Sequence, residues 1–136
     1  MTEGDRPRLL EAERTRSIIG CFYRVYNGLR HGYREHIYGL ALDRELAEAG
    51  HRVDREVAVM VYYRGRPLAR QKLDMIVDSR IVIEIKAAAH LPPDATAQLF
   101  SYLCATDLEV GLLLHFGREP RFHRVLSENR LRTLDR

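Results

Sequence analysis

Apolar side chains recur with a helical period over the first third of the chain. Between Arg14 and Leu29 they lie at helical spacing, and His31-Gly32 then interrupts the pattern. A second amphipathic helix is predicted from about Tyr33 to Ala49, with Glu35 in its first turn and Gly50 as its C-terminal stop. The chain therefore begins with two predicted helices.

After Gly50 the apolar period changes to two, which indicates β-strands. Apolar and polar residues alternate from Val57 to Tyr63, and residues 64–67 supply a turn. Leu68 to Val77 and Ile81 to Lys86 are predicted as the next two strands, joined by a turn at residues 78–80. These three strands are expected to form a meander.

The last part of the chain predicts one more helix and further strands. Pro92-Pro93-Asp94 is typical of a loop that opens a helix, with its aspartate as N-cap, and helical spacing continues to Cys104. Val110 to Phe116 has the pattern of a buried strand, and Arg121 to Leu126 allows an additional edge strand. Ser127 to Arg136 is expected to form a basic, frayed tail.

This order of elements predicts an α/β (α+β) fold in which helices flank a mixed central sheet. A chain of 136 residues fits one domain and is long enough to bury a core without disulfides or a structural metal. We therefore expect a single domain over residues 1–136, with its core from about residue 18 to residue 126.

The chain is mildly basic, with a formal net charge of +3 and an isoelectric point near 9.1. The basic excess lies toward both ends of the chain, at Arg6, Arg8, Arg14, Arg16, Arg118, Arg121, Arg124, Arg130 and Arg132. A polyanion such as nucleic acid would bind such a surface, but a solvated face in an arginine-rich protein has the same composition. Charge alone does not decide between these alternatives.

Membrane insertion and disulfide bonding are not expected. No apolar run is long enough to span a bilayer, and the first residues are charged instead of forming a signal-peptide core. Cys21 and Cys104 lie in apolar helical contexts without metal-ligand spacing, so we expect reduced thiols and no zinc site. These features predict a cytoplasmic protein.

Charged residues in two neighbouring predicted strands are the main candidates for chemistry. Period-two geometry places Glu84 and Lys86 on one strand face, roughly 7 Å apart. A hairpin about residues 78–80 would bring Asp74 close to Glu84. Two adjacent carboxylates repel, and a hard divalent cation relieves this by binding oxygens of both, while a lysine beside them could orient or deprotonate a metal-bound water.

Lysine itself is rare in this chain, because only Lys72 and Lys86 occur among 22 basic residues. Arginine keeps its proton in proteins, whereas lysine is a compact charge with a tunable pKa, so its retention at position 86 favours a chemical role. A structural salt bridge between Glu84 and Lys86 would explain the same residues. The spacing leaves both alternatives open.

Three short motifs together resemble a known family. Asp74 followed by Glu84-Ile85-Lys86 resembles the D…ExK signature of the PD-(D/E)XK nuclease superfamily. Residues 32–38, Gly-Tyr-Arg-Glu-His-Ile-Tyr, match the GxxExxY motif of one of its subfamilies, and residues 98–102, Gln-Leu-Phe-Ser-Tyr, resemble the QxxxY motif of RecB-like nucleases. The resemblance extends from about residue 18 to residue 117.

Two positions depart from the family pattern. Leu73 stands where the name of the superfamily places proline, and His115 stands where asparagine is expected in the subfamily. Neither departure removes an expected metal ligand.

The resemblance implies a restriction-endonuclease-like αβββαβ core. It also implies metal-dependent hydrolysis of phosphodiester bonds in nucleic acid, with DNA as the expected substrate. Asp74 and Glu84, with the main-chain carbonyl of Ile85, would hold one Mg²⁺ or Mn²⁺. Glu35 would complete this site directly or through water. Lys86 would position the attacking water.

Gln98 and Tyr102 would then contact Lys86 or the scissile phosphate, since they lie one helical turn apart. They could equally be an ordinary polar pair on a half-buried helix. Glu35 suits a first helical turn whatever its function, and Tyr38 has the spacing of a core residue. The histidines show no metal-binding array and are expected to be surface or satisfied residues: His36, His51, His90, His115 and His123.

Three functions compete at this point. The first is a metal-dependent nuclease in DNA repair, recombination or defence. The second is a non-cleaving nucleic-acid-binding or scaffolding module on the same fold, and the third is a protein-interaction adaptor that exposes an apolar patch. Whether the chain forms a homodimer or binds a protein partner is left open.

Overall fold

The computed structural model of the chain describes residues 11–127. Within this range the elements follow the predicted order: α2 (Ala12–Leu29), α3 (Glu35–Glu48), β1 (Val53–Tyr63), β2 (Arg66–Val77), β3 (Ile81–Lys86), α4 (Ala95–Ala105), β4 (Val110–Phe116) and β5 (Pro120–Leu126). Hydrophobic periodicity therefore predicted both the type and the order of these elements.

The strands form one five-stranded sheet in the order β1-β2-β3-β4-β5. The first three are an antiparallel meander, and α4 provides the crossover that makes β4 parallel to β3. The additional edge strand is also present, because β5 pairs antiparallel with β4. The mixed sheet with flanking helices confirms the predicted α+β fold and its αβββαβ order.

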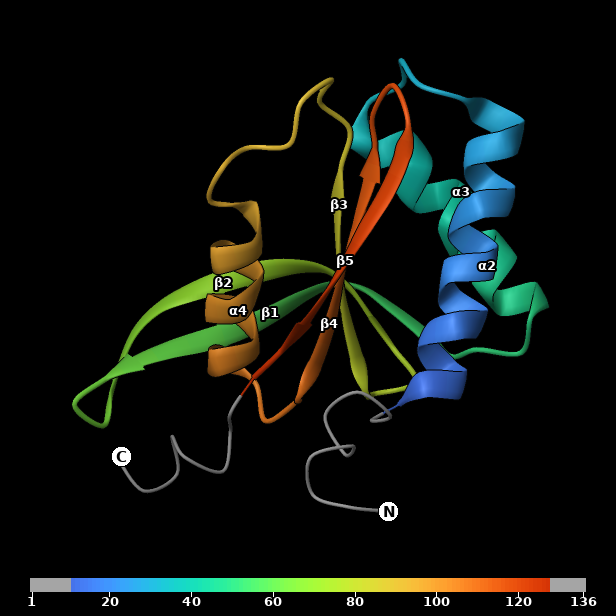
Figure 1. The fold of residues 1–136 in the computed structure, drawn as a ribbon. Coiled ribbons are helices and arrows are strands. Elements are labelled where there is room, and N and C mark those ends of the chain that lie inside the picture. The colour runs from blue at the N-terminus through green and yellow to red at the C-terminus, as the bar shows by residue number, and fades with distance from the viewer. Residues whose placement is uncertain (1–10, 128–136) are drawn as a thin grey trace, which may run out of the picture.

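Helices cover both faces of the sheet (Figure 1). Helices α2 and α3 pack on one face in a core that includes Phe22, Leu42 and Phe116. Helix α4 covers the other face, where Leu99 and its neighbours meet the side chains of β3 and β4. Since both faces of β3 and β4 are covered, each of these strands is buried along almost its whole length.

Tyr38 links the helical layer to the loop that precedes α3. Its ring is fully buried and stacks on Phe116 with the ring centroids 4.1 Å apart. Its hydroxyl donates a hydrogen bond to the carbonyl of Arg30 and accepts one from the N–H of Tyr33 at 3.2 Å. Tyr38 is thus a core residue, as its spacing predicted, and it fixes the start of the helix that carries Glu35.

The first two strands change faces near Asp74. Leu73 packs in the core under α4, whereas Met75 packs in the core under α2 and α3. Regular alternation would place both side chains on one face. The change coincides with Glu56, which has a φ of 51° and lies, like Asp74, in the gap between the pairs Arg55↔Met75 and Val57↔Leu73. Residues 57–73, called the hairpin arm below, therefore turn out of the plane of the remaining sheet.

Several predicted details need correction. β1 and β2 are longer than predicted, and β2 includes Pro67. Asp94 occupies the N-cap of α4 but makes no side-chain capping hydrogen bond. Ser127 does not belong to a frayed tail, because its N–H donates to the Glu109 carbonyl at 2.8 Å.

Some predictions concern residues outside the described range, namely the rest of the tail at 128–136 with Arg130 and Arg132, and Arg6 and Arg8 at the other end. Within that range neither cysteine forms a disulfide; Cys21 is buried and Cys104 half-buried. None of the helices there is long and apolar enough to cross a bilayer.

Substitution of Tyr38 tests its structural role. We expect Tyr38→Phe to lower the free energy of unfolding by about 1 kcal/mol, because the Arg30 carbonyl and the Tyr33 N–H lose a shared partner. Tyr38→Ala should cost about 3–5 kcal/mol through the cavity it leaves beside Phe116. Urea denaturation followed by circular dichroism measures both, with the exposed Tyr62→Phe as the control. A Tyr38→Ala protein as stable as wild type would contradict the packing described.

Candidate active site

Asp74 and Glu84 meet where β2 and β3 part. The two strands pair from Val77↔Ile81 to Met75↔Ile83, and Asp74 and Glu84 occupy the next opposed positions. The Asp74 N–H donates to Glu84 Oε1 at 3.3 Å, and the Ile85 N–H donates to Asp74 Oδ2 at 2.7 Å. Each carboxylate thus accepts an N–H of the other strand in place of the ladder partner that the parting strands no longer provide.

The carboxylate pair is electrostatically unfavourable without a cation. Glu84 is only 6% exposed. Burial and then repulsion from Asp74 raise the pKa of Glu84 to about 8. Burial also raises the pKa of Asp74, although the hydrogen bond from Ile85 opposes that shift. At neutral pH the pair therefore tends to keep a proton unless a positive charge is bound beside it.

Lys86 points to α4 and not to Glu84. Its Nζ donates a hydrogen bond to Gln98 Oε1 at 3.4 Å, a contact that the sequence motifs led us to expect. Within the described part of the chain no ion pair joins Lys86 to Glu84. No direct contact therefore supports the alternative of a structural salt bridge between them. The ammonium still acts through space, because it lowers the pKa of both Glu84 and Asp74.

Tyr102 lies on the same helix, one turn after Gln98. Burial raises the pKa of Tyr102, and the carboxylates of Glu84 and Asp74 raise it further. A hydrogen bond with the Gln98 side chain opposes this rise. The phenol is therefore near the carboxylate pair, and the structure brings Asp74, Glu84, Lys86, Gln98 and Tyr102 into one neighbourhood.

Glu35 approaches the pair less closely. It is exposed in the first turn of α3 and lines a cavity of about 190 Å³ together with Asp74 and Ile85. Among residues 11–127 no three His, Cys, Asp or Glu side chains gather closely enough to form a metal site by themselves. Of the two alternatives for Glu35, direct ligation or ligation through water, this geometry favours water.

Arg55 and Glu56 line the same cavity, and the sequence analysis did not single them out. The Nε of Arg55 is buried without a hydrogen-bond partner, and the positive charge of Arg55 lowers the pKa of Asp74. Gly39 of α3 makes room for it, since a Cβ there would lie 3.3 Å from Arg55 Nη2. The sequence did contain a signal for Arg55: it occupies an inward position of the β1 alternation, between Val53 and Val57, where an apolar residue is expected.

His115 corrects the prediction that every histidine is at the surface or satisfied. It is 5% exposed and lies next to Lys86 in the parallel register of β3 and β4. Its Nε2 lies 2.6 Å from the Ala88 carbonyl oxygen, whereas its Nδ1 is buried without a partner. His115 is therefore satisfied at only one ring nitrogen.

The donor set fits a hard divalent cation. Asp74 and Glu84 provide two neighbouring carboxylates, the ligand type that Mg²⁺ and Mn²⁺ prefer, and both carry pKa values raised by burial. Mg²⁺ normally keeps several waters and binds through one or two carboxylates, so a third protein carboxylate is not required. The two side chains are therefore a plausible core of such a site on chemical grounds.

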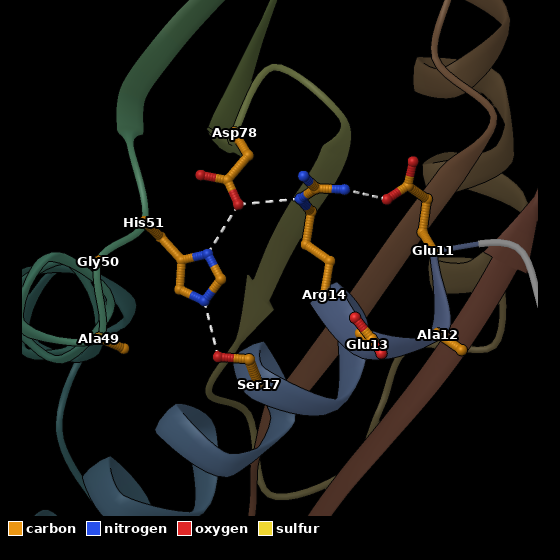
Figure 2. A pocket seen from close by; sticks show the side chains of 9 residues that line it. All are labelled: Glu11, Ala12, Glu13, Arg14, Ser17, Ala49, Gly50, His51 and Asp78. Atoms are coloured by element: carbon orange, nitrogen blue, oxygen red, sulfur yellow. Dashed lines mark hydrogen bonds and ion pairs between the residues drawn. The ribbon is translucent and has the colours of Figure 1, made fainter.

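A second polar cluster lies at the turn between β2 and β3 (Figure 2). Ser17 Oγ lies 2.7 Å from His51 Nε2, and His51 Nδ1 lies 2.7 Å from Asp78 Oδ2. Arg14 Nε donates to the same Asp78 oxygen at 2.9 Å, and the Arg52 N–H donates to the other at 2.8 Å. The cluster thus ties α2 and the α3–β1 connection to the turn that starts β3.

This cluster borders a larger cavity, about 580 Å³, than the carboxylate pair does, but it has a structural explanation. Burial disfavours the charged form of Asp78, yet the hydrogen bonds from His51, Arg52 and Arg14 outweigh it and lower the pKa of Asp78. A hydrolytic serine also needs N–H donors aimed at the reacting carbonyl, and Ser17 lies inside α2, where its own N–H belongs to the helix. We therefore assign the chemistry to the carboxylate pair.

Comparisons with known proteins identify a family and a shared fold. A model of the PD-(D/E)XK nuclease superfamily matches residues 12–125 of the sequence. The crystal structure of SSO0001 resembles this fold with a TM-score of 0.55 at 22% identity, covering 90% of this chain and 61% of that one. An alkaline exonuclease from Laribacter hongkongensis gives a TM-score of 0.48 at 14% identity, covering 90% of this chain and 74% of that one. No curated protein matches the sequence.

The raised carboxyl pKa values predict how the stability of the metal-free protein varies with pH. Between the ordinary pKa of Glu84, 4.5, and its folded value of about 8, the folded state holds more protons than the unfolded state. Stability in EDTA should therefore fall as pH rises from 5 to 8. The pKa of Asp78 is lowered, so its contribution to folding stability is lost only at more acidic pH. Urea denaturation at several pH values measures the slope.

Glu84→Gln should flatten this slope, whereas the exposed Glu48→Gln should leave it unchanged. Millimolar Mn²⁺ should raise the melting temperature most at the alkaline end of the range, where the carboxylates are free of protons. Stability in EDTA that rises between pH 5 and pH 8 would contradict the pKa shifts of the pair.

Proposed function

The chain belongs to the PD-(D/E)XK nuclease superfamily, and from that premise we propose that it is a metal-dependent nuclease that hydrolyses phosphodiester bonds of DNA. The observation that carries the proposal is the pair of Asp74, half-buried, and Glu84, buried, held together where two strands part, with Lys86 nearby. Residues 32–38 support membership of the GxxExxY subfamily. Repair, recombination or defence are the processes that such an activity would serve.

The proposed metal site consists of Asp74, Glu84 and the main-chain carbonyl of Ile85, with Glu35 acting through water. A bound Mg²⁺ or Mn²⁺ supplies Lewis-acid activation of the phosphate and lowers the pKa of a coordinated water. Asp74 and Glu84 would hold that ion where β2 and β3 part.

Lys86 holds the attacking water and the phosphate oxygens by hydrogen bonds, since an ammonium donates three protons and accepts none. The Gln98 carbonyl oxygen accepts one of these protons and so fixes the direction of the side chain. Tyr102 lies one turn further along α4 and can donate to the phosphate from the same side. Arg55, with a buried unpaired Nε at the cavity, adds positive charge where the scissile phosphate would be negative.

The second candidate function is a non-cleaving nucleic-acid-binding or scaffolding module on the same fold. The raised pKa values of Asp74 and Glu84 argue against it, because two buried carboxylates destabilise a metal-free fold. A module that only binds nucleic acid has no chemical need for this cost. The presence of Lys86 and Gln98 beside the carboxylate pair therefore favours a nuclease over a non-cleaving module.

Substitution of the site residues separates ligation from positioning. Asp74→Ala should abolish both metal binding and DNA cleavage, because it removes an oxygen ligand. Lys86→Ala should lower the cleavage rate about 10²–10⁴-fold while metal binding persists, because an ammonium cannot ligate a cation. Glu35→Ala should weaken metal binding less than Asp74→Ala. Calorimetric titration with Mn²⁺ and cleavage of linear, circular and single-stranded DNA and of RNA provide the measurements.

DNA binding in EDTA should survive all three substitutions and decline with salt, since it rests on cations outside the cluster. The exposed Glu48→Ala is the matched control. If the wild-type protein binds DNA but cleaves no substrate with Mg²⁺ or Mn²⁺, and Lys86→Ala behaves like wild type, the non-cleaving module is the better description.

A further inference from the structure

We propose that one face of the hairpin arm, carrying Tyr62, Arg70 and Lys72, binds a single strand of nucleic acid and directs it toward the Asp74–Glu84 pair. The destination of the strand rests on the proposed nuclease function. The binding itself rests on the charge, exposure and register of the arm, and can be measured without any cleavage.

The arm is basic along its whole length. Residues 57–73 include Arg64, Arg66, Arg70 and Lys72 and contain no aspartate or glutamate. The first seven residues of β2, Arg66–Lys72, are all exposed. None of these four cations forms an ion pair with another described residue, so all four are available to a polyanion. This local concentration of charge is stronger evidence than the small net charge of the whole chain.

Large apolar and aromatic side chains accompany the charges. Tyr62 is 64% exposed, Tyr63 is 61% exposed and Leu68 is 68% exposed. The guanidinium of Arg64 lies over the ring of Tyr63, 5.5 Å from its centroid. An exposed aromatic ring among cations, as Tyr62 is here, gives a base of a single strand a face on which to stack, whereas the bases of a duplex have no free faces. The composition therefore favours a single strand.

The register shows which face is free. Leu73 and Val59 pack under α4, so the alternate positions turn to the opposite face. Alternation along β1 places Ala58, Met60 and Tyr62 on that opposite face. Lys72 and Arg70 share it as the partners of Ala58 and Met60, and the register then shifts between Val61 and Tyr62. None of the helices within residues 11–127 covers the tip of the hairpin, which extends past α4 in Figure 1.

This free face leads to the carboxylate pair. Lys72 precedes Asp74 by two residues, and Asp74 lines the cavity between the sheet and α3. The strand would therefore reach the carboxylate pair from the α3 side, whereas Lys86 and Gln98 lie on its α4 side. Asp74 lies seven residues along β2 from Pro67, the partner of Tyr62, a path of roughly 23 Å. A strand of nucleic acid lying along this path would meet Tyr62 first, then Arg70, then Lys72, and then the site.

A second copy of this chain is the competing occupant, because β1 is an edge strand with free backbone groups. Two arms brought together edge to edge would place their unpaired cations side by side, which is unfavourable. Charge complementarity therefore favours a polyanion over a second copy.

Fluorescence anisotropy with labelled oligothymidylate in EDTA tests the binding. We expect Tyr62→Ala to weaken binding about tenfold, by loss of one stacked base, and Tyr62→Phe to retain it. The double variant Arg70→Ala, Lys72→Ala should weaken binding at least tenfold and reduce the slope of log K against log salt by about 1.4, from two lost contacts. Arg16→Ala, an exposed arginine of α2, should bind like wild type. Circular dichroism and melting curves confirm that each variant is folded.

Hydrolysis of a small diester, bis(4-nitrophenyl) phosphate, with Mn²⁺ separates the arm from the site. The arm variants should hydrolyse this diester at the wild-type rate while cleaving DNA more slowly. If the wild type hydrolyses neither substrate but the variants still lose binding, the arm proposal stands and the proposed function fails.

Three results would overturn the arm proposal. The first is wild-type affinity for oligothymidylate in both Tyr62→Ala and the double variant. The second is equal affinity of the wild type for a duplex of the same length, with the same losses, which would remove the assignment to a single strand. The third is a dimer in light scattering that Tyr62→Ala dissociates without any change in DNA affinity.

Discussion

The parting of β2 from β3 after Met75 is the constraint on which both the candidate site and the hairpin arm depend. Buried backbone N–H groups need partners, and where two strands part the ladder no longer supplies them. Here the N–H groups of Asp74 and Ile85 donate to the carboxylates of Glu84 and Asp74. The same parting turns residues 57–73 out of the sheet, with Glu56 at a φ of 51° on the neighbouring strand. Site and arm are two consequences of one structural feature.

Other parts of the fold offset the destabilisation that the carboxylate pair causes. Two carboxylates with raised pKa values destabilise the metal-free protein, while the positive charges of Lys86 and Arg55 reduce that cost only in part. The stability comes from the layer of α2 and α3, where Tyr38 and Phe116 stack, and from the polar cluster at Asp78 that ties α2 to the β2–β3 turn. A well-packed scaffold beside an electrostatically unfavourable carboxylate pair is the division of roles expected of a functional site.

Much of the fold was predictable from the sequence, because each helix and strand carries its own apolar period. The opposition of Asp74 and Glu84 was also predictable, since a hairpin about residues 78–80 sets it. The change of face between Leu73 and Met75 was not, because both residues are apolar and alternate regularly in the sequence. Contacts between elements distant in sequence, such as that of Arg55 with Gly39, could not be predicted for a similar reason, because no local sequence pattern indicates them.

The register nevertheless contains a reason for the strands to part. If the pairing of Met75 with Ile83 continued, Asp74 would face Glu84 and, two residues further, Lys72 would face Lys86. Like charges directly opposite one another destabilise a β-ladder, and here two such pairs would follow in succession. The separation of β2 from β3 avoids the repulsion between Lys72 and Lys86, because Lys72 lies on the hairpin arm. The first pair stays together, held by the backbone N–H groups of Asp74 and Ile85. The sequence thus opposes a continuous hairpin at the position where a metal-dependent nuclease would need an open cleft.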